Sequence, residues 1–183
     1  MLKYLLKKKR IPVEKYSGEG TVLISFVTQL DQAISNRSPE ELVEMLKAHL
    51  ATQASIIERN SGIVLLYEGD SVLAFWPKEL AQPDTCRCAF ESAQAMLQKV
   101  HKAFGFQVVL GTGRLAGDYF GPKRQYQVVG PAMNIADKLS KFRYPAHRVV
   151  LLTEATKMQL SNSGLSFQVI GKLGGEDILA YTN

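Results

Sequence analysis

The spacing of apolar and polar positions changes several times along the chain, and each change indicates a new element of secondary structure. Residues 20–30 are mostly apolar and β-branched, which is typical of a buried strand. Apolar residues then recur every three or four positions up to residue 57, which predicts a helix. Its start carries a capping box formed by Ser38 and Glu41, with Pro39 at the first helical position.

The same alternation of periods continues to the end of the chain. It predicts strands at 63–68 and 71–76, a helix over 84–103, strands at 106–117 and 126–130, a helix over 131–142, a strand at 148–152, a short helix at 153–160, and strands at 165–171 and 177–182. The first six elements follow the order β-α-β-β-α-β of a ferredoxin-like unit. We therefore expect an α+β protein: a ferredoxin-like βαββαβ core, with helices on one face of its sheet, followed by an extra hairpin, a helix and further strands.

Length and composition are those of one globular domain. The chain has 183 residues, of which 46% are hydrophobic and 21% charged, so it can bury a full core. No segment approaches the ~20 apolar residues of a membrane span, and no signal peptide is recognised. Two cysteines, Cys86 and Cys88, do not form a disulfide framework, and a cytoplasmic location follows as the expectation.

The net charge of +5 is confined to one end of the chain. Residues 1–16 hold six basic side chains and one acidic side chain, and residues 17–183 hold equal numbers of both. We expect a basic N-terminal arm over 1–16 and one domain over 17–183. A neutral domain gives no reason to expect nucleic-acid binding. The arm also contains leucine and tyrosine, which suits weak contact with the inner membrane surface. A solvated leader or a helix end packed on a partner is the alternative, and the pattern favours it.

Asp70 stands behind Gly69 at the tip of the hairpin predicted over 63–76, and its side chain has two interpretations. Glycine tolerates positive φ and aspartate caps turns, so turn chemistry alone explains the pair. A carboxylate held at the end of two apolar strands also suits a metal ion, because Mg²⁺ prefers oxygen ligands. The hairpin pattern leaves both interpretations open.

Three segments carry a more specific signal: SGIVLLYEGDSVLAFWP at 61–77, VVLGTGRLAGDYFG at 108–121 and QYQVVGPAMNIADKL at 125–139. Their order, spacing and glycines together resemble the class III nucleotidyl cyclase domain, the catalytic module of adenylyl and guanylyl cyclases. The resemblance runs from about Val22 to the end of the chain.

The resemblance implies a reaction that uses two metal ions. The ribose 3′-oxygen of a nucleoside triphosphate attacks the α-phosphorus and expels pyrophosphate, while Mg²⁺ or Mn²⁺ held by two Asp side chains neutralises charge. In the family the complete site needs groups from both subunits of a head-to-tail dimer. The resemblance therefore implies Mg or Mn if nucleotide is bound, a purine nucleotide as ligand, and a second copy or a related cyclase domain as partner.

Four residues match the functional positions of the family. The resemblance assigns Asp70 to metal binding, Asn134 and Lys138 to the catalytic helix, and Asn134 and Gln127 to nucleotide binding. Lys138 stands in place of an arginine, so it keeps the charge but loses the planar bidentate fork. Gln127 stands in place of an Asp or Thr that reads the base, and its amide can still form hydrogen bonds.

Two other functional positions are degenerate. Phe26 falls where the family places its other metal-binding Asp, and Leu66 falls where it places a base-reading Lys. Phenylalanine cannot bind Mg²⁺, and the nearest carboxylate, Asp31, comes five residues later, past the expected strand. We therefore predict a degenerate, inactive cyclase-homology domain that acts as a dimerising or regulatory module in cyclic-nucleotide signalling. Two alternatives stay open: a residually active cyclase making cyclic AMP or GMP, and a purine-nucleotide sensor without turnover.

The segment around the turn at 121–125 combines aromatic and cationic side chains: Tyr119, Lys123, Arg124 and Tyr126. Aromatic residues and arginine are frequent anchors of protein interfaces. The resemblance implies that this hairpin reaches across to a second subunit, so we expect a homodimer or a heterodimer with a related cyclase domain. A solvated turn on a monomer is the alternative.

Overall fold

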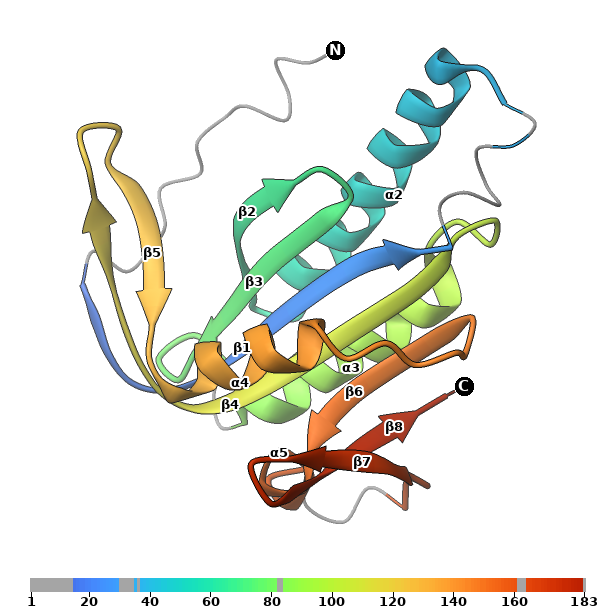
Figure 1. Ribbon diagram of the computed structural model, residues 1–183. Helices are drawn as coiled ribbons and strands as arrows, with labels where there is room; N and C mark the ends of the chain where they lie inside the picture. The colour runs from blue at the N-terminus through green and yellow to red at the C-terminus, as the bar shows by residue number, and fades with distance from the viewer. Residues whose placement is uncertain (1–14, 30–34, 36, 82–83, 161–163, 183) are drawn as a thin grey trace.

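Figure 1 shows the computed structural model, which describes residues 15–29, 35, 37–81, 84–160 and 164–182. In this part of the chain the elements are β1 (Tyr16–Thr28), α2 (Pro39–Arg59), β2 (Ile63–Glu68), β3 (Ser71–Pro77), α3 (Thr85–Lys99), β4 (Gly105–Phe120), β5 (Gln125–Val129), α4 (Pro131–Ser140), β6 (Arg148–Thr153), α5 (Glu154–Met158), β7 (Gln168–Leu173) and β8 (Glu176–Tyr181). No helix among these is long and apolar enough to cross a membrane.

One mixed sheet organises the fold. Its strand order is β2-β3-β1-β4-β6-β8-β7, with β5 paired to the far half of β4. The core β1-α2-β2-β3-α3-β4 has the element order expected of a ferredoxin-like unit, and its strands pair antiparallel. β6 adds parallel to β4, and the β7–β8 hairpin completes the sheet. The predicted α+β class and the extra C-terminal elements are confirmed.

The helix ends have local and distant causes. At the start of α2, Ser38 Oγ accepts a hydrogen bond from the Glu41 amide at 3.2 Å and the Glu41 carboxylate accepts one from the Ser38 amide at 2.9 Å, so the predicted capping box is present. α3 ends at Lys99, earlier than the expected residue 103. The Arg148 guanidinium donates to the carbonyl oxygens of Val100 and His101 at 3.2 and 3.0 Å, which replaces the next turn of helix.

Helices lie on both faces of the sheet, and the two helices of the ferredoxin-like core share one face, as expected. α2 and α3 pack on one face, and α4 lies across β4 and β1 on the other (Figure 1). Gly111 permits this close packing, because a Cβ there would lie 2.1 Å from the Ala132 carbonyl oxygen. α4 therefore leaves only part of this face open, between itself and the β2–β3 hairpin.

The N-terminal boundary differs slightly from the expected one. β1 begins at Tyr16, the last residue of the expected basic arm, because residues 16–20 pair with Gly113–Gly117 of β4. The arm itself, at residues 1–14, lies outside the described residues. Its contact with a membrane surface and the division of the chain at residue 16 therefore stay predictions.

Candidate functional site

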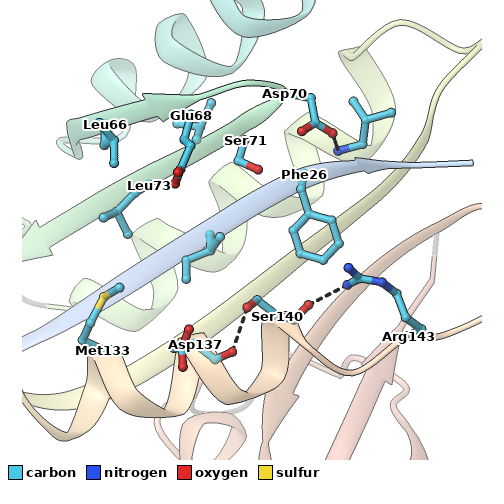
Figure 2. Close-up of a pocket in the computed structure, with 13 residues that line it drawn as sticks. Phe26, Leu66, Glu68, Asp70, Ser71, Leu73, Met133, Asp137, Ser140 and Arg143 are labelled. Atoms are coloured by element: carbon cyan, nitrogen blue, oxygen red, sulfur yellow. Dashed lines mark hydrogen bonds between the residues drawn. The ribbon is translucent and has the colours of Figure 1, made fainter. Parts of the chain in front are cut away.

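A pocket of about 480 Å³ lies on the partly open face of the sheet, between the end of β1, the β2–β3 hairpin and α4 (Figure 2). Apolar side chains from the strands and α4 form much of its wall: Ile24, Phe26, Val27, Leu66, Val72, Leu73 and Met133. Polar and charged side chains complete it: Glu68, Asp70, Ser71, Asp137, Ser140 and Arg143. The pocket thus brings together three residues singled out from the sequence, namely Phe26, Leu66 and Asp70.

Asp70 has a structural role in the hairpin. Gly69 adopts a φ of 59°, which permits the tight turn, and the Asp70 Oδ2 atom accepts a hydrogen bond from the Val27 amide at 3.0 Å. The ladder between β1 and β3 ends at the pair Ser25–Val72, so this bond continues the contact between the two strands beyond its last residue pair. Asp70 therefore links the hairpin turn to β1, and one of its two carboxylate oxygens is already engaged.

Phe26 stands where the resemblance places the other metal-binding carboxylate, and Arg143 lies over its ring. The Phe26 side chain is 9% exposed, and the Arg143 guanidinium carbon lies 4.9 Å from its ring centroid. Arg143 Nη1 also donates to the Ser140 carbonyl oxygen at 2.6 Å, and Figure 2 shows the Phe26 ring between Asp70 and Arg143. A guanidinium over an aromatic face is a favourable cation–π contact of about 0.5–1 kcal/mol when exposed.

These residues do not fit a centre for two divalent ions. Mg²⁺ requires near-octahedral oxygen coordination. Phe26 supplies no metal ligand. The Oδ2 atom of Asp70 accepts a hydrogen bond from the Val27 amide, and Arg143 places a positive charge over the Phe26 ring. Within the described residues, no group of three His, Cys, Asp or Glu side chains is arranged to hold a metal ion. Asp31, the nearest carboxylate after Phe26, lies outside the described residues.

Other pocket residues were not predicted from the sequence. Met133, Asp137 and Ser140 line the pocket from one side of α4, and their three- and four-residue spacing is the signal that would have found them. Glu68 lies at the end of β2, two positions before Asp70. Arg143 follows α4, and no local pattern marks it as a pocket residue.

The remaining predicted residues lie outside this pocket. Asn134 and Lys138 are exposed on α4, and Gln127 is exposed on β5 opposite Asp118 of β4. A single chain therefore does not bring the predicted metal position together with the predicted catalytic and base-contacting residues.

The residues predicted for a dimer contact on the β4–β5 hairpin differ in their exposure in the single chain. Tyr126 is 4% exposed, and its ring packs against Tyr119 with centroids 5.1 Å apart. Burial raises the pKa of the Tyr126 hydroxyl to about 12. Tyr126 is therefore an internal packing residue of the single chain, and its role at a dimer contact stays a prediction. Phe120, 46% exposed, and the exposed Lys123 and Arg124 occupy the accessible end of the hairpin.

A buried histidine lies on the face of the sheet opposite the pocket. His49 of α2 is 1% exposed, and its ring meets the Phe104 and Phe106 rings edge to face at 5.2 and 5.1 Å. Neither ring nitrogen has a hydrogen-bond partner among the described residues. Burial lowers the pKa of His49 to about 4, and repulsion from Arg148 and His101 acts in the same direction. His49 is therefore a neutral core residue at physiological pH.

Comparison with known proteins relates the chain to nucleotidyl cyclases. It is 26% identical over 168 residues to Adenylate cyclase 1 of Rhizobium meliloti (strain 1021), a match that covers 84% of this chain and 25% of that protein. It is 25% identical over 134 residues to Uridylate cyclase of Rhodovulum sp. (strain MB263), covering 62% of this chain and 56% of that protein. The matches thus span about a quarter and about half of these relatives' lengths. No family model matches the chain.

The fold comparison gives the same result. The structure is similar to the guanylyl cyclase domain of the RhoGC fusion protein from Blastocladiella emersonii, with a TM-score of 0.76, 17% identity, and coverage of 92% of this chain and 96% of that domain. The chain therefore has the fold of a class III nucleotidyl cyclase domain, which confirms the resemblance that its three motifs carry.

Proposed function

We propose that this chain is a cyclase-homology domain that has lost the two-metal reaction and serves as a dimerising or regulatory module in cyclic-nucleotide signalling. The observation that carries the proposal is the pair Phe26 and Arg143. By the resemblance, Phe26 stands where the reaction needs a metal-binding carboxylate, and the Arg143 guanidinium lies over its ring at 4.9 Å.

The charges around the pocket support loss of the reaction. Without metal ions a nucleoside triphosphate would bring its negative phosphates next to Glu68, Asp70 and Asp137, and Arg143 is the one cation among the pocket's lining residues. Asp137 is paired with Lys141 at 2.7 Å, but Glu68 and Asp70 make no ion pair within the described part of the chain. Repulsion by these two carboxylates disfavours the nucleotide sensor and the residual cyclase relative to the pseudo-enzyme.

The positions of the remaining residues support a dimer. Asn134, Lys138 and Gln127 are exposed and lie outside the pocket of their own chain. In a head-to-tail pair they would face the pocket of a second subunit. The RhoGC cyclase domain from B. emersonii, whose fold this chain shares, is described as a non-canonical dimer, which supports association of two such domains but not a particular arrangement. We propose a second copy or a related cyclase domain as partner, with the exposed end of the β4–β5 hairpin at the contact.

Sedimentation tests the assembly. At tens of micromolar we expect a species of twice the single-chain mass of 20.3 kDa. The change Phe120→Ala, which removes an exposed aromatic side chain from the hairpin, should shift this species toward the single chain. Met158→Ala on α5, where the side chain is 76% exposed, is the matched control and should leave the mass unchanged. A single-chain species of the unaltered protein at this concentration would remove the homodimer from the proposal.

Nucleotide titration tests the loss of the metal site in the same sample. We expect no saturable heat with ATP, GTP or UTP in the presence of Mn²⁺. Binding that requires Mn²⁺ and disappears in Asp70→Asn would instead favour the sensor or the residual cyclase.

A further inference from the structure

The pocket beside Phe26 remains a sizeable cavity although it does not fit two metal ions. Its volume is about 480 Å³, within the range of small-molecule sites. The side chains of Phe26, Leu66, Leu73 and Met133 form an apolar part of its wall on the strands and on α4, while polar groups make up more of its exposed surface. The apolar part can cover the apolar body of a small molecule.

Its polar groups are distributed unevenly. The β2–β3 hairpin contributes Glu68 and Asp70, which make no ion pair with any residue that the structure describes. The Oδ2 atom of Asp70 accepts the Val27 amide hydrogen, and Oδ1 has no partner in the described part of the chain. On the far side of the Phe26 ring, Arg143 is held by the Ser140 carbonyl oxygen and not by a carboxylate. Two carboxylates without an ion pair among the described residues therefore stand beside the apolar part of the pocket wall.

The Phe26 ring already accepts a cation. The Arg143 guanidinium carbon lies 4.9 Å from the ring centroid, within the distance at which an aromatic face attracts positive charge. Because Arg143 occupies this face, a ligand meets only the edge of the ring, and the carboxylates of Glu68 and Asp70 are the groups that can recognise an ammonium group through charge-assisted hydrogen bonds.

We infer that this pocket binds a small organic cation, an ammonium group attached to an apolar or aromatic body. The ammonium group donates to Glu68 and to Asp70 Oδ1, and the body covers Leu66, Leu73 and the edge of Phe26. This inference rests on the proposed function, because it requires that no metal–nucleotide complex fills the same pocket.

Titration with 2-phenylethylamine, followed by NMR chemical shifts of the full chain, tests the inference. Two compounds of nearly the same shape serve as controls: 2-phenylethanol lacks the charge, and phenylacetate reverses it. We expect saturable shifts centred on Phe26 and Leu66, with the amine binding about tenfold more tightly than the alcohol because its hydrogen bonds to carboxylates are charge-assisted. Phenylacetate should bind more weakly than the alcohol.

Variants of the β2–β3 hairpin test whether its two carboxylates bind the amine. Glu68→Gln and Asp70→Asn should each weaken amine binding several-fold; asparagine retains an oxygen that can accept the Val27 amide hydrogen, so the hairpin is kept. Glu91→Gln, which neutralises an exposed carboxylate paired with Arg87 on α3, is the matched control and should leave binding unchanged.

Three outcomes would overturn the inference: equal binding of amine and alcohol, shifts centred outside the pocket, or amine binding unchanged by Glu68→Gln. Failure of the proposed function looks different. In that case ATP or GTP with Mn²⁺ binds in an Asp70-dependent manner and displaces the amine.

Discussion

Replacing Phe26 by aspartate restores the second carboxylate of the two-metal pattern, and the structure predicts that this change alone is insufficient. The new carboxylate would lie next to the Arg143 guanidinium, whose carbon is 4.9 Å from the present ring centroid. Arg143 would then compete with a divalent cation for the carboxylate. We predict that Phe26→Asp gains Mn²⁺ affinity only weakly, and that adding Arg143→Gln increases the gain.

The magnitude follows from the charges. Two unit charges about 5 Å apart attract by about 3 kcal/mol at an effective dielectric constant of about 20. Arg143 is exposed, so solvent screening reduces the net value to about 1 kcal/mol or less. Removing the guanidinium should therefore increase the Mn²⁺ affinity of the Phe26→Asp variant by about fivefold.

The assay is a double-mutant cycle read by Mn²⁺-induced relaxation of water protons, with Phe26→Asn as the uncharged control. Because the Phe26 side chain is largely buried, its replacement by a polar group should lower the free energy of unfolding by about 2–4 kcal/mol. Circular dichroism must therefore show folded variants before affinities are compared.

Two results would refute this reasoning. One is a folded Phe26→Asp, Arg143→Gln variant that binds Mn²⁺ no better than the unaltered chain, which would place position 26 outside the metal register. The other is an equal gain in Mn²⁺ affinity when Arg143→Gln is introduced into the unaltered chain. Arg143 would then weaken Mn²⁺ binding without competing for a carboxylate at position 26.

Three further predictions concern stability. Gly111→Ala should lower the free energy of unfolding in urea by about 3 kcal/mol or more, because the added Cβ would lie 2.1 Å from the Ala132 carbonyl oxygen and must displace α4; a loss below about 1 kcal/mol would contradict the tight packing. His49 has a folded pKa of about 4, below its unfolded value of 6.5, so the unfolded state binds more protons and stability should fall by up to about 3 kcal/mol between pH 6.5 and pH 4. His49→Phe should flatten this part of the curve, and an unchanged slope would assign it to other groups. Tyr126→Ala should lower the free energy of unfolding of the single chain by about 3 kcal/mol, because the ring is buried. An unchanged melting temperature would contradict the burial of this ring.

Sequence patterns predicted most elements because their causes are local. The capping box at Ser38 and the Gly69–Asp70 turn depend on residues within a few positions of each other, and both are present in the structure. The predicted end of α3 was wrong by four residues because Arg148, far along the chain, donates hydrogen bonds to the carbonyl oxygens of Val100 and His101, just beyond the helix. The placement of α4 on the second face likewise depends on close packing at Gly111.

The candidate site was predictable only where family motifs marked it. Phe26, Leu66 and Asp70 line one pocket. The resemblance to the cyclase family places all three at positions of one functional site. Arg143 was missed because it reaches Phe26 from a segment more than a hundred residues away, and no periodicity records such a contact. Tyr126 was assigned to an interface because aromatic residues are frequent interface anchors; within the single chain its ring packs over Gly117 of the neighbouring strand, and the interface role stays a prediction.

Cyclic-nucleotide formation by the purified chain tests the central claim most directly. Unaltered chain and Asp70→Asn are incubated separately with ATP, GTP and UTP, first in Mg²⁺ and then in Mn²⁺, and cyclic product is measured by mass spectrometry. The account predicts no cyclic product from the unaltered chain above the level of Asp70→Asn with any of the three nucleotides. Cyclic product that accumulates with repeated turnover in the unaltered chain, and is lost in Asp70→Asn, would contradict it.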